Sequence, residues 1–124
     1  MSNTILLITP PFTQLNTPYP ATAYLKGFLN TKKINAFQAD LGIEATLALF
    51  NKQGLQDLFA HIAAGMPALS PNTERILALQ DDYIYTIDEV ILFLQGKRPT
   101  LAHRIAKRDF LPEADRFSQL DDLT

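Results

Sequence analysis

The most constraining feature of the sequence is a run of four apolar residues near the amino terminus, Ile5-Leu6-Leu7-Ile8. Side chains alternate between the two faces of a strand, so this run is apolar on both faces. Strands of that kind are typical of parallel sheets covered on both sides. Pro10 and Pro11 follow and end the strand, because proline has no backbone N–H to donate. The sequence therefore predicts a central strand over residues 4–9.

A helix and a second strand follow this strand. Pro20 suits the first position of a helix, and apolar residues after it recur at helical spacing to about Thr31. This apolar stripe comprises Ala21, Tyr24, Leu25 and Phe28. Residues 34–40 then predict a strand that ends in Asp40. A right-handed crossover would make the strands parallel and place Asp40 and the loop after Thr9 at one edge of the sheet, where ligands of open α/β sheets bind.

The rest of the chain has a helical pattern. The expected helices cover residues 43–52, 55–64, 71–79, 100–107 and 113–123, and residues 86–89 resemble a capping box ahead of the apolar run 90–94. The predicted fold class is α/β, a parallel strand–helix–strand unit followed by a mostly helical region. We expect a single domain over residues 1–124, with the unit in residues 1–45 and a helical elaboration in residues 46–124.

A sheet of two strands is too small to bury both apolar faces of the strand predicted over residues 4–9. Burying four Leu or Ile side chains contributes roughly 6–12 kcal/mol, which is comparable with the whole net stability of a domain, about 5–15 kcal/mol. Either the later helices cover both faces, or further strands come from another chain or from sequence beyond Thr124. We favour the second alternative, in which this chain is an incomplete domain and its partner is the remainder of its own polypeptide. Open strand edges also make a homodimer a reasonable expectation.

The composition removes several classes of site. The chain has no cysteine, so it cannot by itself hold a disulfide, a cysteine-ligated zinc or an iron–sulfur cluster. His61 and His103 lie far apart, which makes a histidine-rich metal site unexpected. Phosphate-binding and dinucleotide loops need glycine directly after the first strand, and the first glycine is Gly27. No serine stands in the setting of a nucleophile elbow.

Charge and hydropathy set the expected surroundings of the protein. A net charge of −2 does not favour nucleic acid. The first apolar run is too short to cross a bilayer, and no basic segment precedes it. We expect a cytoplasmic protein that binds neither nucleic acid nor membrane.

Three features together resemble a known family. Residues 5–11 (Ile-Leu-Leu-Ile-Thr-Pro-Pro), residues 19–29 (Tyr-Pro-Ala-Thr-Ala-Tyr-Leu-Lys-Gly-Phe-Leu) and the second strand ending in Asp40 are similar to the start of the cobalamin-binding domain of many radical S-adenosylmethionine enzymes. The likeness covers about residues 4–45. It implies a Rossmann-like, flavodoxin-like sheet of five parallel strands whose carboxyl edge supports the corrin ring of cobalamin.

The resemblance also implies a second domain. In the family, a barrel with a three-cysteine motif holds the iron–sulfur cluster and S-adenosylmethionine, and this chain has no cysteine for that motif. The chain alone is therefore not expected to be an enzyme and has no catalytic residues, whereas its parent protein would be one. Members that bind cobalt through histidine carry Asp-x-His-x-x-Gly after the first strand, and residues 9–14 lack it. We expect no metal ligand here.

Carried over position by position, the resemblance places cofactor-binding residues on both sides of the first loop and at the end of the second strand. They are Thr9, Pro10, Pro11, Phe12, Pro18, Tyr19, Pro20 and Asp40. A rigid loop of proline and aromatic residues offers apolar contact to a flat ring at low entropic cost. Two alternatives stay open: the loop can act only as a strand stop and helix start, and Asp40 can cap the next helix rather than bind a ligand.

The expected function is that of an amino-terminal segment of a cobalamin-dependent radical S-adenosylmethionine enzyme, which helps to position cofactor or substrate. The main alternative is a non-enzymatic helical module that binds a partner protein. A sensor that binds a small molecule at the same sheet edge is a third possibility.

Overall fold

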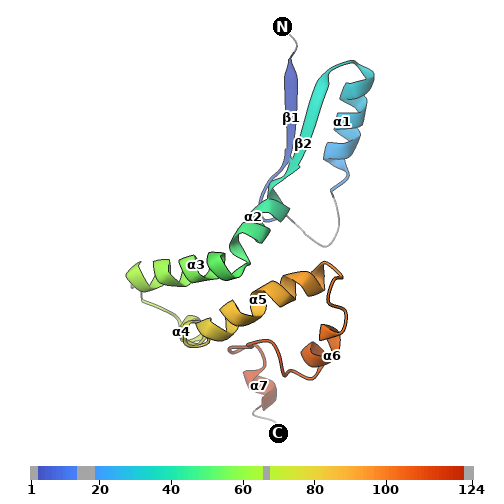
Figure 1. Cartoon of the computed structure of the whole chain (residues 1–124). Coiled ribbons are helices and arrows are strands. Elements are labelled where there is room, and N and C mark those ends of the chain that lie inside the picture. Colours follow the sequence, from blue (N-terminus) through green and yellow to red (C-terminus); the bar gives the residue numbers. More distant parts are fainter. Residues whose placement is uncertain (1–2, 14–18, 66–67, 122–124) are drawn as a thin grey trace. The chain divides into compact units, whose positions relative to one another are not determined.

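The computed structural model describes residues 3–13, 19–65 and 68–121. The chain divides into two compact units, Met1–Ala48 and Leu49–Thr124 (Figure 1). The division falls close to the boundary that the sequence predicts between the strand–helix–strand unit and the helical region.

The described residues of the first unit form two strands, one helix and all but the last residue of a second helix. They are β1 (Thr4–Thr9), α1 (Ala21–Thr31), β2 (Asn35–Asp40) and α2 (Leu41–Leu49). The two strands pair in parallel from Thr4 opposite Asn35 to Thr9 opposite Asp40. The predicted parallel strand–helix–strand unit is therefore confirmed, and both strands end at the same edge.

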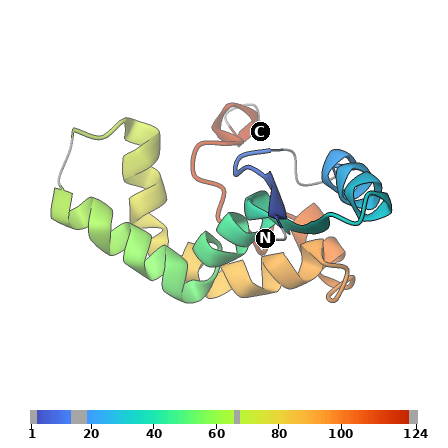
Figure 2. The same cartoon turned by 90° about the horizontal axis from the view of Figure 1, so that it is seen from above.

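The sheet is covered on one face. Helix α1 contacts both strands and lies beside them (Figures 1 and 2). Burial alternates along β1: Ile5 and Leu7 are half-buried and Thr9 is buried, whereas Leu6 and Ile8 are 57% and 48% exposed. Phe37, the partner of Leu6 in β2, is also exposed. The strand that is apolar on both faces thus keeps one of its faces exposed.

The apolar stripe of α1 is exposed as well. Tyr24 is 78% exposed, and Leu25 and Phe28 also lie at the surface. The ammonium group of Lys32 lies 5.5 Å from the centre of the Phe28 ring, a cation–π contact at the surface. Among the described residues of the first unit, the buried hydrophobic side chain is the small Ala36.

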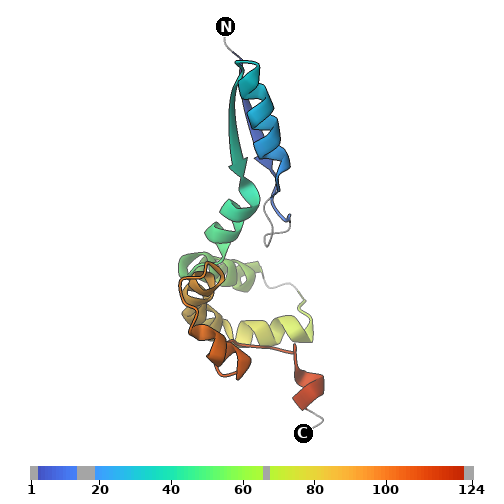
Figure 3. The same ribbon diagram turned by 90° about the vertical axis from the view of Figure 1, so that its right-hand side faces the viewer.

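The second unit is helical. Its helices are α3 (Lys52–Gly65), α4 (Pro71–Ala78), α5 (Gln80–Leu94), α6 (Leu101–Ala106) and α7 (Ser118–Asp121). Helices α3 and α5 pack against each other (Figure 3).

The core of the second unit contains large apolar side chains. Leu55 and Phe59 of α3 and Leu101 of α6 are buried. The backbone N–H of Lys52 donates to the carboxylate of Asp88 at 3.2 Å, which ties the start of α3 to α5. The Asn51 side chain accepts the N–H of Gly54 at 2.9 Å and so caps α3.

Two sequence-based predictions for this unit are wrong. Thr86 does not begin a helix, because it lies inside α5, where its buried hydroxyl donates to the Asp82 carbonyl at 2.8 Å. The expected helix over residues 113–123 is reduced, among the described residues, to Ser118–Asp121. Ala114 has a φ of 46°, a left-handed backbone that an α-helix cannot contain. By contrast, the helix predicted over residues 71–79 is confirmed as α4, and Ser70 caps it, since its hydroxyl accepts the N–H of Thr73 at 3.3 Å.

None of the helices in the described part of the chain combines the length and the apolar character needed to cross a membrane.

Candidate functional site

The candidate site is the carboxyl edge of the sheet in the first unit. Thr9 and Asp40 are the last residues of β1 and β2, and they face each other in the parallel register. Pro10 and Pro11 leave β1 at this edge and are exposed. The parallel pairing therefore brings the proline loop and the start of α2 together, as the sequence predicts.

Asp40 has a structural role at this edge. Its carboxylate oxygen Oδ1 accepts the backbone N–H of Ile43 at 3.0 Å. This bond satisfies one of the N–H groups at the start of α2 that have no partner within the helix. Of the two roles left open for Asp40, the structure shows the helix cap. Asp40 is half-buried, so part of the side chain still reaches the surface.

The proline loop folds back on itself directly after β1. The Thr13 hydroxyl donates to the Pro10 carbonyl at 3.2 Å, which closes a tight turn. Phe12 lies in this turn with a φ of 64°, a left-handed backbone that is rare for a bulky residue. Its side chain is fully exposed. Strained backbone of this kind is often found where a side chain is held for binding.

Gly42 lies in the first turn of α2, close to the proline loop. A Cβ atom on Gly42 would lie 3.0 Å from Thr13 Oγ1, 3.1 Å from Asp40 Oδ1 and 3.4 Å from the Pro10 carbonyl oxygen. The first two distances are shorter than ordinary contacts of a Cβ atom. Gly42 is buried, and its missing side chain allows the loop to approach the first turn of the helix.

Sequence reasoning did not single out Gly42. The available signal is a glycine in the first turn of a helix directly after a strand-ending aspartate, and it becomes informative only when the loop after β1 is known to lie opposite. The structure groups Thr9, Pro10 and Asp40 with Gly42.

The remaining predicted site residues lie elsewhere on the loop. Tyr19 and Pro20 are exposed at the start of α1, where the Pro20 carbonyl accepts the N–H of Tyr24 at 3.0 Å. Pro20 takes the N-cap position rather than the first helical position. Pro18 lies outside the described residues.

The side chains exposed at this edge are suited to contact with an apolar ring. The exposed surfaces of Pro10, Pro11 and Phe12 are apolar, and Asp40 adds an acceptor. Within residues 3–13, 19–65 and 68–121, no group of three or more His, Cys, Asp or Glu side chains could hold a metal ion. His61 is exposed on α3, in the second unit. The described residues at this edge therefore offer an exposed apolar surface beside one carboxylate acceptor.

Comparisons of the chain with protein-family models, with curated proteins and with solved structures find no match.

Proposed function

We propose that the first unit is part of a larger parallel α/β sheet of the cobalamin-binding type, and that its carboxyl edge forms one wall of the cofactor site. The observation that carries this proposal is the edge itself. Two parallel strands end side by side there, and a stiff proline turn holds the fully exposed ring of Phe12 in a left-handed backbone. Such a ring offers flat apolar contact without a large loss of side-chain entropy on binding.

The uncovered side of the sheet supports a larger assembly. Leu6, Ile8 and Phe37 lie on the face that α1 does not cover, and each is about half exposed. Full burial of such side chains contributes about 1.5–3 kcal/mol each. Additional strands beside β1, with a helix on the uncovered face, would bury the exposed parts of these side chains and so stabilise the sheet further. The additional elements belong either to the remainder of a longer polypeptide or to a second copy of the chain.

The chain's own residues would hold the cofactor rather than react with it. When bound, cobalamin supplies the reactive cobalt. Pro10, Pro11 and Phe12 would contact the ring through apolar surface, and Asp40 would accept a hydrogen bond from a ligand amide or hydroxyl. In this proposal the radical chemistry belongs to a parent enzyme that also binds an iron–sulfur cluster and S-adenosylmethionine.

The first experiment is made on the protein from its native cells. An antibody against this chain isolates the protein, whose intact mass and visible absorption are then measured. We expect a mass well above that of this chain and the absorption of a corrinoid after extraction with cyanide. A protein that carries no corrinoid and has the mass of this chain would contradict the proposal and favour a helical interaction module.

The second experiment tests the residues. Hydroxocobalamin is titrated into the isolated full chain, and its visible absorption is followed. We expect a saturable change that weakens in Phe12→Gly, a variant that removes the ring and suits a positive φ. Tyr85→Ala is the matched control, because Tyr85 is an exposed aromatic residue on α5 in the other unit. Equal binding by both variants and the wild type would contradict the role of Phe12.

A further inference from the structure

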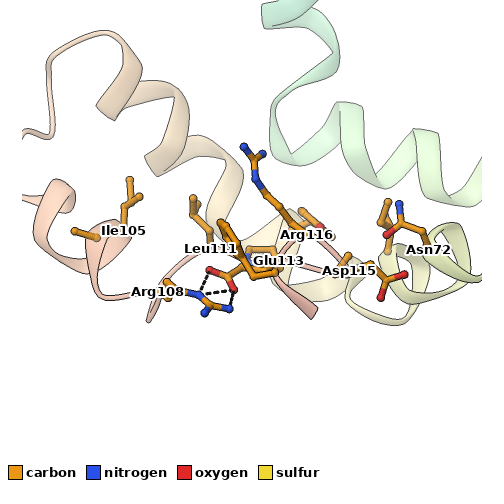
Figure 4. A pocket seen from close by; sticks show the side chains of 13 residues that line it. Asn72, Ile105, Arg108, Leu111, Glu113, Asp115 and Arg116 are labelled. Atoms are coloured by element: carbon orange, nitrogen blue, oxygen red, sulfur yellow. Dashed lines mark hydrogen bonds and ion pairs between the residues drawn. The ribbon is translucent and has the colours of Figure 1, made fainter. Parts of the chain in front are cut away.

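The second unit contains a hollow of about 980 Å³ that the proposed function does not use (Figure 4). Its walls come from α4, α5, α6 and the segment 108–117. The larger apolar side chains of the lining include Ile76, Tyr83, Ile105, Leu111 and Phe117. A hollow of this size is comparable with sites that bind small organic molecules.

The carboxylates that line the hollow are already engaged by arginines. Glu113 accepts hydrogen bonds from the Nε atom of Arg108 at 3.1 and 3.0 Å (Figure 4). Asp115 forms an ion pair with Arg75 of α4. Neither carboxylate is therefore available to compensate a further positive charge.

Arg116, which also lines the hollow, carries a further positive charge. The guanidinium carbons of Arg108 and Arg116 lie 4.6 and 5.8 Å from the centre of the same Phe117 ring. Of these two cations, Arg108 has a carboxylate partner, while no carboxylate of the described part of the chain pairs with Arg116. The lining therefore combines apolar surface with one uncompensated guanidinium group.

The wall of the hollow has an unusual backbone. Arg108 and Ala114 have φ values of 60° and 46°, so left-handed residues that are not glycine stand at both ends of the segment 108–114. Strained positions of this type concentrate at binding sites, where the surrounding contacts hold them in place.

Tyr83 adds a donor to the apolar lining. Burial raises the pKa of the Tyr83 phenol above its ordinary value of 10.0, so the hydroxyl stays protonated near neutral pH and is able to donate a hydrogen bond.

We propose that this hollow binds a small carboxylate with a flat apolar body. The carboxylate would be neutralised by Arg116, and the apolar body would cover Ile76, Leu111 and Phe117. A bound anion would also reduce the repulsion between the two guanidinium groups that share the Phe117 ring.

The test uses 2-naphthoate as the probe and amide chemical shifts of the ¹⁵N-labelled full chain as the readout. We expect saturable shifts at Ala106, Ala114 and Phe117. Arg116→Gln should weaken binding at least about tenfold, the effect of losing a charge-assisted hydrogen bond. Arg104→Gln is the matched control: Arg104 also lies over an aromatic ring, 4.9 Å from the centre of Phe110, and does not line the hollow. Its affinity should equal that of the wild type.

A cationic analogue of the same shape, 2-naphthylmethylammonium, separates charge recognition from general adsorption. We expect it not to shift these amides. Equal shifts from the anion and the cation, unchanged binding in Arg116→Gln, shifts confined to Leu6, Ile8 and Phe37 of the first unit, or no shift at all would each overturn the proposal.

Discussion

The two units of the chain differ in the burial of their large apolar side chains. In the second unit, Leu55 and Phe59 are buried where α3 packs against α5. In the first unit, Leu6, Ile8 and Phe37 share an exposed face. Both units carry enough apolar residues for a core, so composition does not explain the difference. In the described part of the chain, the second unit supplies two layers from its own helices, whereas the first has a helix on one face of its sheet.

This difference predicts which of the two units additional structure would stabilise more. A two-stranded sheet is marginal without further strands or a second covering layer. The second unit is expected to keep its fold by itself, and the first to gain stability when its bare face and open edges are covered. Substitutions in each unit therefore test the comparison directly.

The largest expected effect is that of emptying the core of the second unit. Phe59→Ala should lower the free energy of unfolding by about 3–5 kcal/mol, because it removes a buried aromatic side chain and leaves a cavity. Phe37→Ala in the first unit should lower it by only about 1 kcal/mol, because about half of the side chain is already exposed. Urea unfolding followed by circular dichroism measures both.

The same two variants, measured at several protein concentrations, test whether a second copy of the chain binds to the exposed face of the sheet. If the destabilisation by Phe37→Ala grows with concentration, while that by Phe59→Ala does not, the exposed face of the sheet is an interface between copies of the chain. Equal and large effects of both variants at every concentration would show that Phe37 is covered within one chain and would break the comparison.

The next effect concerns the edge at which the candidate site lies. Gly42→Ala should lower the free energy of unfolding by about 1–2 kcal/mol, since the added methyl group crowds Thr13, Asp40 and the Pro10 carbonyl. Gly27→Ala is the matched control in α1, where nothing lies within 4 Å of the added Cβ. It should raise stability by about 0.5–1 kcal/mol through helix propensity. Stabilisation by both would mean that the loop does not pack against α2.

Much of the first unit follows from local sequence signals. The apolar run, the double proline and the helical stripe are each short-range patterns, and the structure places β1, α1 and β2 within a residue or so of the predicted bounds. The exposure of the apolar stripe of α1 could not be predicted from these local patterns. Tyr24 and Phe28 are exposed, because a two-stranded sheet gives α1 too narrow a surface to cover its whole apolar face.

The errors in the second unit arise from contacts that local patterns do not encode. Residues 86–89 match a capping box, but the Thr86 hydroxyl is satisfied by the carbonyl of Asp82 within a longer helix. The segment after residue 108 has a helical pattern, yet Glu113 and Asp115 pair with Arg108 and Arg75, and Ala114 is left-handed.

The candidate site was predictable in position and incomplete in detail. The parallel pairing of β1 with β2 made Asp40 a neighbour of the proline loop, as expected. The strained backbone of Phe12 and the close approach at Gly42 were not predictable, since each depends on how the loop returns to α2.

A smaller effect is expected from the helix caps, one in each unit. Asp40→Ala should cost about 1 kcal/mol, because the N–H of Ile43 loses its acceptor, whereas Asp40→Asn keeps an acceptor and should change stability by only a few tenths of a kcal/mol. Ser70→Ala at α4 should resemble Asp40→Ala. Urea midpoints measure all three. A loss with Asp40→Asn as large as that with Asp40→Ala would mean that the charge of Asp40, rather than the cap, matters at the sheet edge.

The smallest effect should appear only at high pH and belongs to the second unit. Burial raises the pKa of Tyr83 above 10.0, so the folded chain holds this proton more tightly than the unfolded chain does. The contribution of Tyr83 to stability is then fully present below about pH 10 and is lost as the pH rises through the pKa of the folded state. Urea midpoints of the wild type should fall over that range, and those of Tyr83→Phe should fall less. Parallel pH profiles for the two proteins would indicate that Tyr83 is as solvated as the exposed side chains of the first unit, and the contrast between the units would not extend to this residue.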